Sequence, residues 1–442
     1  MDRRIVITGI GAVTPAGVGP AALTDAVRAG RSAVGPIRRF DASGFPSRVA
    51  GEVPEFDNVA GLRKEQARYV KKNVKVMGRD IQLAIAAAGH AILDTGLPLG
   101  DPKAGEPVLP TIDHARFGMI FGTSFIPTEL DDLAAPAQAS LEDGRVTLKK
   151  WGEFGIPQMF PLWLLKFLPN MHACHTGILW DAQGPSNSLT CSDAGGLVAL
   201  DEACRILCRG DAERMLAAGA ESRVTPVLLM RYCLLNRLAT ARGDPAAASR
   251  PFDLDRTGWV AAEGAAVLML EPLDVAEQRG ARIYGEVLGT GLGATTAGVN
   301  TCDEDGRGVA NAVRSALENA GVDPADLGAV FAHGPALPMQ DRAEAAGLAA
   351  ALGPAAAKVP VTATKGVTGH MGAASGLADL VAALLLAKDG HVPPIVNCDR
   401  PDPDVSLNLV TGKAAPWVGD RFLVTTNAIG GQTAAAVIRV NR

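Results

Sequence analysis

The chain has 442 residues, of which 48% are hydrophobic and 50 are glycine, and its formal net charge is -5 at pH 7. This length and composition indicate a large compact protein and exclude an intrinsically disordered one. The small net charge, without a basic patch that contains interleaved aromatic residues, argues against a nucleic-acid partner.

The apolar segments and the cysteines indicate the cellular location of the protein. No apolar run reaches the roughly 18–20 residues of a membrane span, and the run in MDRRIVITGIGAVTPAG is too short for a signal peptide. Seven cysteines without a CxxC pair indicate reduced thiols. We therefore expect a cytoplasmic protein without a membrane contact. No group of residues has zinc-ligand spacing, so we expect no metal and no cofactor.

Apolar segments of strand length and helix length alternate along the chain. In the first half we expect strands at 3–13, 117–124 and 212–222, and helices at 80–96 and from 197 onward. In the second half we expect strands at 264–273, 281–293, 327–334, 421–431 and 433–442, and helices at 308–321, 343–353 and 374–390. This alternation predicts an α/β fold in which helices cover both faces of a sheet.

Residues 125–183 interrupt the alternation. The segment is rich in proline, tryptophan and leucine, and it contains the apolar stretch PLWLLKFL. Two interpretations stand with equal weight, an ordinary cap on the core and a cover for a cavity or a subunit interface. No low-complexity linker divides the chain into independent domains.

The stretch GPSNSLTCSDAGG, residues 184–196, is a turn of small residues that opens a long amphipathic helix. It holds three possible reactive groups in a row, Cys191, Ser192 and Asp193. A nucleophile just before a helix gains from the positive end of the helix dipole. The spacing alone leaves open which of the three has that role.

Two histidines and a lysine lie at strand ends or glycine-rich turns. His333 directly follows the strand LGAVF, and His370 lies in ATKGVTGHMGAASG five residues after Lys365. A lone histidine after a strand is more often a hydrogen-bonded core residue, but this group of three favours a site. Imidazoles can polarise a thioester carbonyl or stabilise a developing enolate.

Over essentially its whole length the sequence resembles the β-ketoacyl-acyl-carrier-protein synthases, condensing enzymes of the thiolase superfamily. The resemblance rests on VITGIGAVTPAG, PFDLDRTGWVAAEGAAVLMLE, KGVTGHMGAASG, HVPPIVN and NAIGG taken together. It implies an α/β, thiolase-like, five-layered αβαβα fold built from two similar halves, here 1–250 and 251–442, with 125–183 as an insertion at a cap or interface. It also implies a dimer.

The resemblance further implies how a site would work. In the family a cysteine takes the acyl chain, and two histidines drive decarboxylation of malonyl-carrier protein; the matching positions are His333 and His370. Lys365 takes the position of a lysine that supports the second histidine. The acyl carrier protein, with a phosphopantetheine-linked acyl or malonyl group, is the implied partner.

Two family motifs are altered in this chain. HGTxTPxxD becomes HGPALPMQD, and NSFGFGG becomes TTNAIGG, so Asn427 stands where the family has a gating phenylalanine. We expect Asn427, Gly430 and Gly431 to contact substrate.

In the family the nucleophilic cysteine lies in the motif GPxxxxSTACATG, before a helix that leads into RGDA. In this chain the matching position does not hold a cysteine. Counting forward from Gly184 and Pro185, and back from RGDA at 209–212, gives Asp193 both times. Cys191 lies two residues too early, and no base is assigned to Ser192. A mixed anhydride on Asp193 would be far more labile than a thioester.

A replaced cysteine followed by AGG resembles the chain-length-factor subunits of type II polyketide synthases, although those typically have glutamine at this position. This predicts a polyketide or fatty-acid synthase subunit that forms a heterodimer with an active ketosynthase and shapes the acyl-chain tunnel. The alternative is an enzyme, either a 3-oxoacyl-acyl-carrier-protein synthase that uses Cys191 or a malonyl-carrier-protein decarboxylase that uses His333 and His370. Pairing with itself as a homodimer also stays open.

Overall fold

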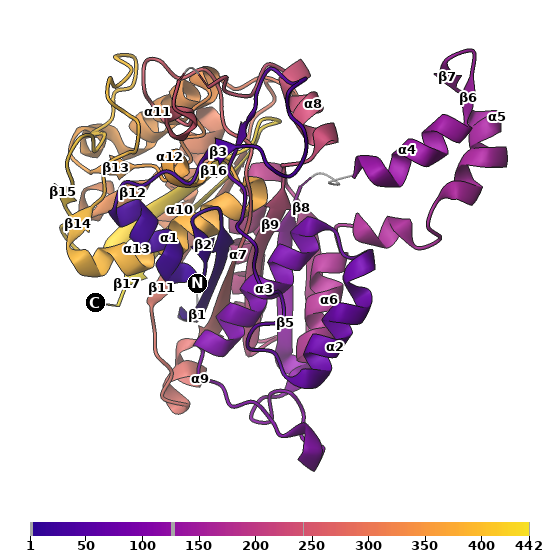
Figure 1. The fold of residues 1–442 in the computed structure, drawn as a ribbon. Coiled ribbons are helices and arrows are strands. Elements are labelled where there is room, and N and C mark those ends of the chain that lie inside the picture. The colour runs from indigo at the N-terminus through magenta and orange to yellow at the C-terminus, as the bar shows by residue number, and fades with distance from the viewer. Residues whose placement is uncertain (1–2, 125–128, 242, 442) are drawn as a thin grey trace.

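The computed structural model describes residues 3–124, 129–241 and 243–441. The predicted insertion at 125–183 therefore has four residues, 125–128, outside the described part, as does residue 442 of the last predicted strand. The described strands include one mixed sheet of eleven strands, with helices between its two halves and on their outer faces (Figure 1). No helix in the described ranges is long and apolar enough to cross a membrane.

The main sheet contains two sets of five strands with the same topology. The first set lies in the order β1-β10-β9-β5-β8 and the second in the order β11-β17-β16-β12-β13. The first set comprises β1 (Ile5–Thr14), β5 (Phe117–Thr123), β8 (Ser186–Thr190), β9 (Arg214–Ser222) and β10 (Glu263–Pro272). The second set comprises β11 (Gly285–Ala294), β12 (Ala329–Phe331), β13 (Val361–Thr362), β16 (Arg421–Asn427) and β17 (Gln432–Val440). If the five strands of each set are numbered by their order in the chain, both sets lie across the sheet in the order first, fifth, fourth, second, third.

The pairing directions repeat as well, which confirms two similar halves. In each set the first strand is antiparallel to the fifth, the fifth antiparallel to the fourth, and the remaining neighbours are parallel. A short antiparallel pairing of β1 with β11 joins the sets. The repeat assigns β10 (Glu263–Pro272) to the first set of strands. The predicted boundary between the two halves, between residues 250 and 251, remains a prediction.

Six helices complete five layers with the two half-sheets. One outer layer contains α3 (Arg79–Asp94) and α6 (Met171–Trp180), the central layer α7 (Gly195–Arg209) and α13 (Ser375–Leu386), and the other outer layer α10 (Arg307–Ala320) and α11 (Pro338–Leu352). α3 packs on β1, β10 and β9, whereas α10 packs on β11 and β17. α7 and α13 contact strands of both half-sheets. The five-layered αβαβα arrangement is therefore present.

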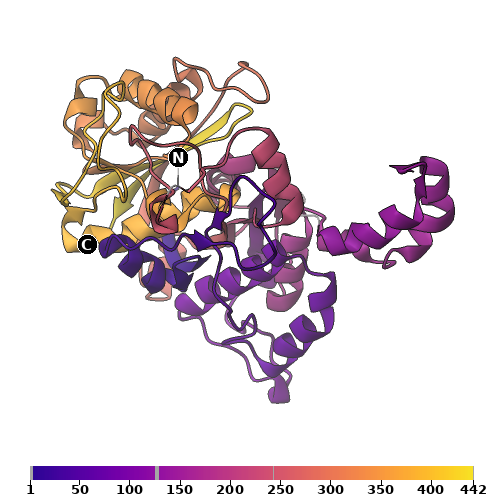
Figure 2. The same cartoon turned by 45° about the horizontal axis from the view of Figure 1, so that its top comes forward.

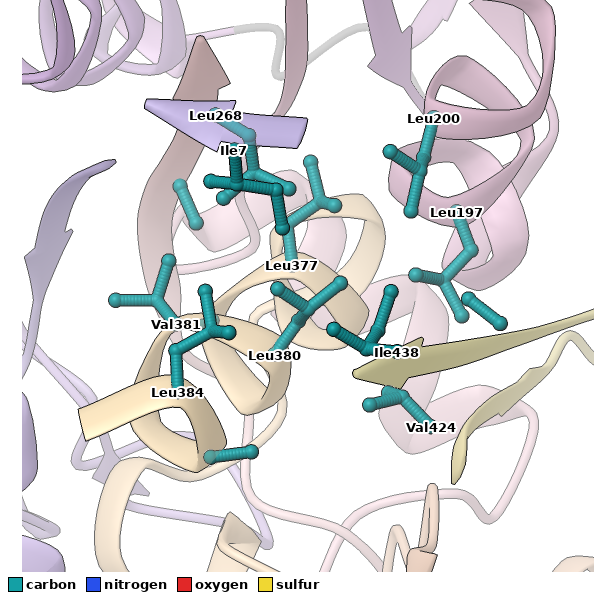
Figure 3. Packing of buried hydrophobic residues seen from close by; sticks show 14 of the residues in the cluster. Ile7, Leu197, Leu200, Leu268, Leu377, Leu380, Val381, Leu384, Val424 and Ile438 are labelled. Atoms are coloured by element: carbon teal, nitrogen blue, oxygen red, sulfur yellow. The ribbon is translucent and has the colours of Figure 1, made fainter. Parts of the chain in front are cut away.

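The central layer explains why α13 is apolar all round. Figure 3 shows Leu377, Leu380 and Leu384 of α13 between Ile7 on one side and Val424 on the other. A helix covered on both sides buries almost every side chain, so no polar face is required.

Shorter elements surround these layers. They are β2 (Gly17–Val18), α1 (Pro20–Arg28), β3 (Gly35–Pro36), β4 (Val49–Ala50), α2 (Lys64–Asn73), α8 (Pro226–Leu234), α9 (Leu273–Gln278), α12 (Lys365–Thr368), β14 (His391–Val392) and β15 (Ala415–Pro416).

Residues 129–166, which are part of the predicted insertion, form an arm that projects from the body in both orientations, whereas α6 of the same insertion belongs to an outer layer (Figures 1 and 2). It contains α4 (Leu130–Ala139), the hairpin β6 (Leu141–Glu142) and β7 (Arg145–Val146), and α5 (Leu148–Lys150). Nine of the 21 exposed large hydrophobic side chains in the described part lie between residues 130 and 164. The arm is therefore largely an apolar surface, whereas Leu165 near its end packs against the core.

Candidate active site

Three buried side chains from distant parts of the sequence meet in the interior. Asp193 lies just before α7, His333 follows β12, and His370 lies between α12 and α13. One potential ligand atom from each lies within 4.8 Å of the other two. The distance from His370 Nε2 to Asp193 Oδ1 is 3.4 Å, and the two imidazole centroids are 5.0 Å apart. The fold thus brings together the three residues that sequence analysis singled out.

A tight turn presents Asp193 to this group. Ser192–Ala194 is a 3-10 turn that runs directly into α7, and Ser192 has a left-handed φ of 51°. The two glycines that follow are packing requirements: a Cβ on Gly195 would lie 3.2 Å from Gly122 Cα, and one on Gly196 would lie 2.5 Å from the carbonyl oxygen of Ala373. The AGG match to chain-length factors therefore has a structural reason of its own.

Arg223 is the site residue that sequence analysis missed. Its guanidinium donates a hydrogen bond to Asp193 Oδ1, and its Nε donates to Glu221 Oε1 at 2.7 Å. The side chains of all three residues are almost completely buried. The sequence AESRV, residues 220–224, could have indicated Arg223. An arginine directly after a buried strand needs buried partners for its charge.

Aromatic rings enclose the Arg223 guanidinium. Its Cζ lies 5.0 Å from the ring centroid of Trp259 and 5.6 Å from that of Tyr232. Trp259 also packs edge-to-face on His370, with a centroid separation of 4.9 Å. These contacts stabilise the cation and hold it at the site.

Gly372 leaves the space that the ion-pair network occupies. A Cβ at this position would overlap Glu221 Oε2 and would lie 2.7 Å from Arg223 Nη2. The next residue, Ala373, donates its backbone N–H to the same Glu221 oxygen at 2.8 Å. The motif GHMGAASG thus supports the Arg223 network as well as His370.

The electrostatics hold Asp193 as an anion and both histidines as neutral rings. Burial alone would raise the pKa of Asp193, but Arg223 and then His370 outweigh it, so that pKa lies far below its ordinary value. Burial lowers the pKa of His370 to about 4. Burial, followed by the charge of Lys365, holds the pKa of His333 well below its ordinary value.

Both imidazoles have ring nitrogens available for chemistry. Neither ring nitrogen of His333 has a hydrogen-bond partner within the described ranges, nor does Nδ1 of His370, whereas His370 Nε2 faces Asp193 Oδ1 at 3.4 Å. The backbone N–H groups of His333 and Gly334 donate to Glu344 at 2.8 Å each, which fixes the loop. The rings are therefore positioned through their backbone and by packing.

Lys365 has a partner other than the one that the resemblance implies. Its Nζ donates to Asp379 Oδ2 at 2.9 Å, and both side chains are buried. Its charge lowers the pKa of both histidines. Lys365 lies close enough to act on the imidazoles electrostatically while its ammonium pairs with a carboxylate.

The predicted substrate-contacting residues lie at the end of β16. Gln340 Nε2 donates to the backbone oxygen of Asn427 at 2.6 Å and to its Oδ1 at 2.8 Å. Gly430 and Gly431 both have positive φ, and Asn427 and Gly431 line a cavity of about 20 Å³. The substrate role of these residues remains a prediction.

Cys191 lies outside the Asp193–histidine group. It is partly exposed, precedes the 3-10 turn, and does not belong to the group of potential ligand atoms found among the described residues. Burial raises the pKa of its thiol, which disfavours the reactive thiolate.

His370 should make stability depend on pH. Its pKa of about 4 is below the ordinary value of about 6.5, so the unfolded chain binds the proton more tightly. We expect its contribution, about 3 kcal/mol, to be complete above pH ~6.5 and to disappear as pH falls to ~4. Urea unfolding from pH 4 to 7 should show a shallower dependence for His370→Gln. The exposed His391→Gln is the control, and equal slopes for both variants would refute the assignment.

Comparisons with known proteins place the chain in a family. Residues 2–276 match the model of the beta-ketoacyl synthase N-terminal domain, and residues 284–399 match that of the C-terminal domain. The chain is 33% identical over 430 residues to 3-oxoacyl-[acyl-carrier-protein] synthase 2 of Synechocystis sp., covering 97% of this chain and 96% of that protein. The chain therefore belongs to the beta-ketoacyl synthase family.

Relatives occur in polyketide biosynthesis too. The ketoacyl synthase alpha subunit of the tetracenomycin polyketide synthase of Streptomyces glaucescens is 33% identical over 441 residues, 99% of this chain and 97% of that protein. The solved structure of the ishigamide ketosynthase/chain length factor superposes with a TM-score of 0.82 at 27% identity, with all of both chains covered. The predicted family and fold are confirmed.

Proposed function

We propose that this member of the beta-ketoacyl synthase family is a non-catalytic, chain-length-factor-like subunit that pairs with an active ketosynthase and shapes its acyl-chain tunnel. The observation that carries the proposal is the buried Arg223–Asp193 ion pair at the expected nucleophile position. An anion paired with a fixed guanidinium is a weak nucleophile, and its acyl anhydride would not persist.

The relatives support the same setting. The Synechocystis relative is named as a 3-oxoacyl-[acyl-carrier-protein] synthase, and the Streptomyces glaucescens relative as a subunit of a polyketide synthase. The similar solved structure is that of a ketosynthase/chain length factor. We therefore propose an acyl carrier protein with a phosphopantetheine-linked acyl group as the visiting partner of the assembled pair.

The surface that would meet the partner subunit has two parts. Within the described part, β8 lies at one edge of the main sheet with β5 as its neighbour, and it is largely exposed. The arm adds the exposed side chains of Leu148, Phe154 and Ile156. An open strand edge together with apolar side chains suits a tightly bound protein partner.

The first experiment is intact-mass spectrometry of the purified chain after incubation with an acyl carrier protein that bears a medium-length acyl group. We expect no acyl adduct, whereas an intact cysteine-bearing ketosynthase treated in parallel gains one. An adduct mapped to Cys191 would overturn the proposal and identify a working condensing enzyme.

A second candidate function is decarboxylation of malonyl-carrier protein. It is favoured by the neutral imidazoles of His333 and His370, whose free nitrogens suit enolate stabilisation. Against it stands Asp193, because two anions ~4 Å apart repel by about 1–4 kcal/mol at effective dielectrics of 80 to 20. Release of CO2 by the purified chain that is lost in His370→Ala would support this candidate.

The arm should contribute to pairing. Leu148 is 90% exposed at the arm's tip, so Leu148→Asp should leave the fold intact but place a charge in the interface. We expect affinity for a co-purifying ketosynthase to fall at least roughly tenfold, measured by analytical ultracentrifugation. Val418→Asp is the matched control, because Val418 is 75% exposed and lies outside the arm. Equal affinities for the two variants would exclude the arm from the interface.

A further inference from the structure

We infer that Asp193, His333 and His370 form a binding site for a first-row divalent metal ion of the zinc type. Two imidazoles and one carboxylate are a common ligand set for such ions, and three protein ligands leave a fourth position for water or a substrate oxygen. The inference does not rest on the proposed pairing with a ketosynthase.

One of the three ligand separations already suits a tetrahedral ion. A zinc ion binds nitrogen and oxygen at roughly 2.0–2.2 Å, so two ligand atoms at a tetrahedral ion lie about 3.4 Å apart. His370 Nε2 and Asp193 Oδ1 are already 3.4 Å apart. The third ligand atom, from His333, lies within 4.8 Å of both, so this imidazole must move closer to the other two ligands to complete the set.

The unused imidazole nitrogens are the independent observation. His333 is 0% exposed, and neither of its ring nitrogens has a hydrogen-bond partner in the described part of the chain. His370 is 1% exposed, and its Nε2 has only the carboxylate of Asp193 near it, at 3.4 Å. A buried polar group without a partner costs about 1–3 kcal/mol. A metal ion would use one lone pair from each ring and remove much of that cost.

The charge balance also favours a cation. Arg223 is shared between Asp193 and Glu221, so one positive charge faces two carboxylates. Lys365 is matched by Asp379. The remaining charge at the site is negative, and Arg223 is placed to orient the carboxylate of Asp193 as an outer partner of the ion.

Sequence spacing gave no sign of this site. Asp193 is 140 residues before His333, which is 37 residues before His370, so no short motif joins them. The three residues meet because β12, α12 and the turn before α7 end at the same place in the fold.

The test is zinc binding by the full chain after dialysis against a chelator. We expect about one zinc per chain to be retained through gel filtration, with an increased unfolding temperature. Asp193→Asn and His370→Gln should each weaken zinc affinity at least roughly tenfold, whereas the exposed His391→Gln should not change it. Unfolding curves without metal will show whether each variant is folded.

Cobalt(II) distinguishes this site from adventitious binding to a cysteine. A histidine–carboxylate site gives visible cobalt bands without a thiolate charge-transfer band, and these bands should disappear in His333→Gln. The inference is overturned if no metal is retained, if the three variants bind as the unaltered chain does, or if the cobalt spectrum shows a thiolate ligand.

Discussion

Replacing Arg223 with methionine should cost about 3–5 kcal/mol of folding free energy at neutral pH, because it removes the cation from a buried ion pair. Methionine keeps much of the side-chain volume but leaves Asp193 and Glu221 without the guanidinium that both contact. Two carboxylates would then be buried together in an apolar setting. Chemical unfolding monitored by circular dichroism measures the loss.

Two further variants test whether charge is the cause. Asp193→Asn in the Arg223→Met background should recover part of the loss, since one stranded anion is removed. Arg400→Met is the surface control: Arg400 pairs with Asp255, and both side chains are more than half exposed. Removing such a solvent-screened pair should leave stability almost unchanged. An Arg223→Met chain as stable as the unaltered one would show that the ion pair contributes nothing.

The pH dependence of stability provides an independent test of the ion pair. In the unaltered chain the folded pKa of Asp193 is depressed, so its contribution is complete above the ordinary pKa of about 4 and is lost as pH falls below it. Without Arg223, burial raises that pKa, and protonation relieves the penalty. The difference in stability between the unaltered chain and Arg223→Met should therefore shrink from pH 7 toward pH 4.

The alternation of strands and helices could be predicted because its signals are local, whereas the five layers were implied by the family resemblance. Apolar segments such as those that became β10 (Glu263–Pro272) and α13 (Ser375–Leu386) are bounded by glycine or proline, and their alternation limits the fold class. The course of the arm could not be predicted. Its exposed leucines, such as Leu148, give an apolar sequence without the neighbours that would show what it packs against.

The site was predictable only in part. His333, His370 and Asp193 could be assigned through motif positions, and the structure places them together. Arg223 could not be assigned, because nothing near it in the sequence shows that the end of β9 faces the turn before α7. The partner of Lys365 was missed for the same reason, since Asp379 lies on α13, 14 residues later.

A double replacement, Asp193→Cys with Arg223→Ala, should give a chain that is acylated by an acyl carrier protein. The turn before α7, His333 and His370 are already in place, so the missing parts are a thiol and space for the acyl carbonyl. Alanine frees the volume between Trp259 and Tyr232 that the guanidinium fills. Intact-mass spectrometry should show one acyl group, mapped to position 193.

Asp193→Cys alone should acylate at least roughly tenfold more slowly, because Arg223 would keep its place through Glu221 and would fill the space that the acyl carbonyl needs. The matched control is Asp193→Ser with Arg223→Ala, which has the space but no thiol and should remain unmodified. Equal rates for the single and double cysteine variants would show that Arg223 does not obstruct the site. The replaced nucleophile would then be the sole reason for the inactivity expected of this chain.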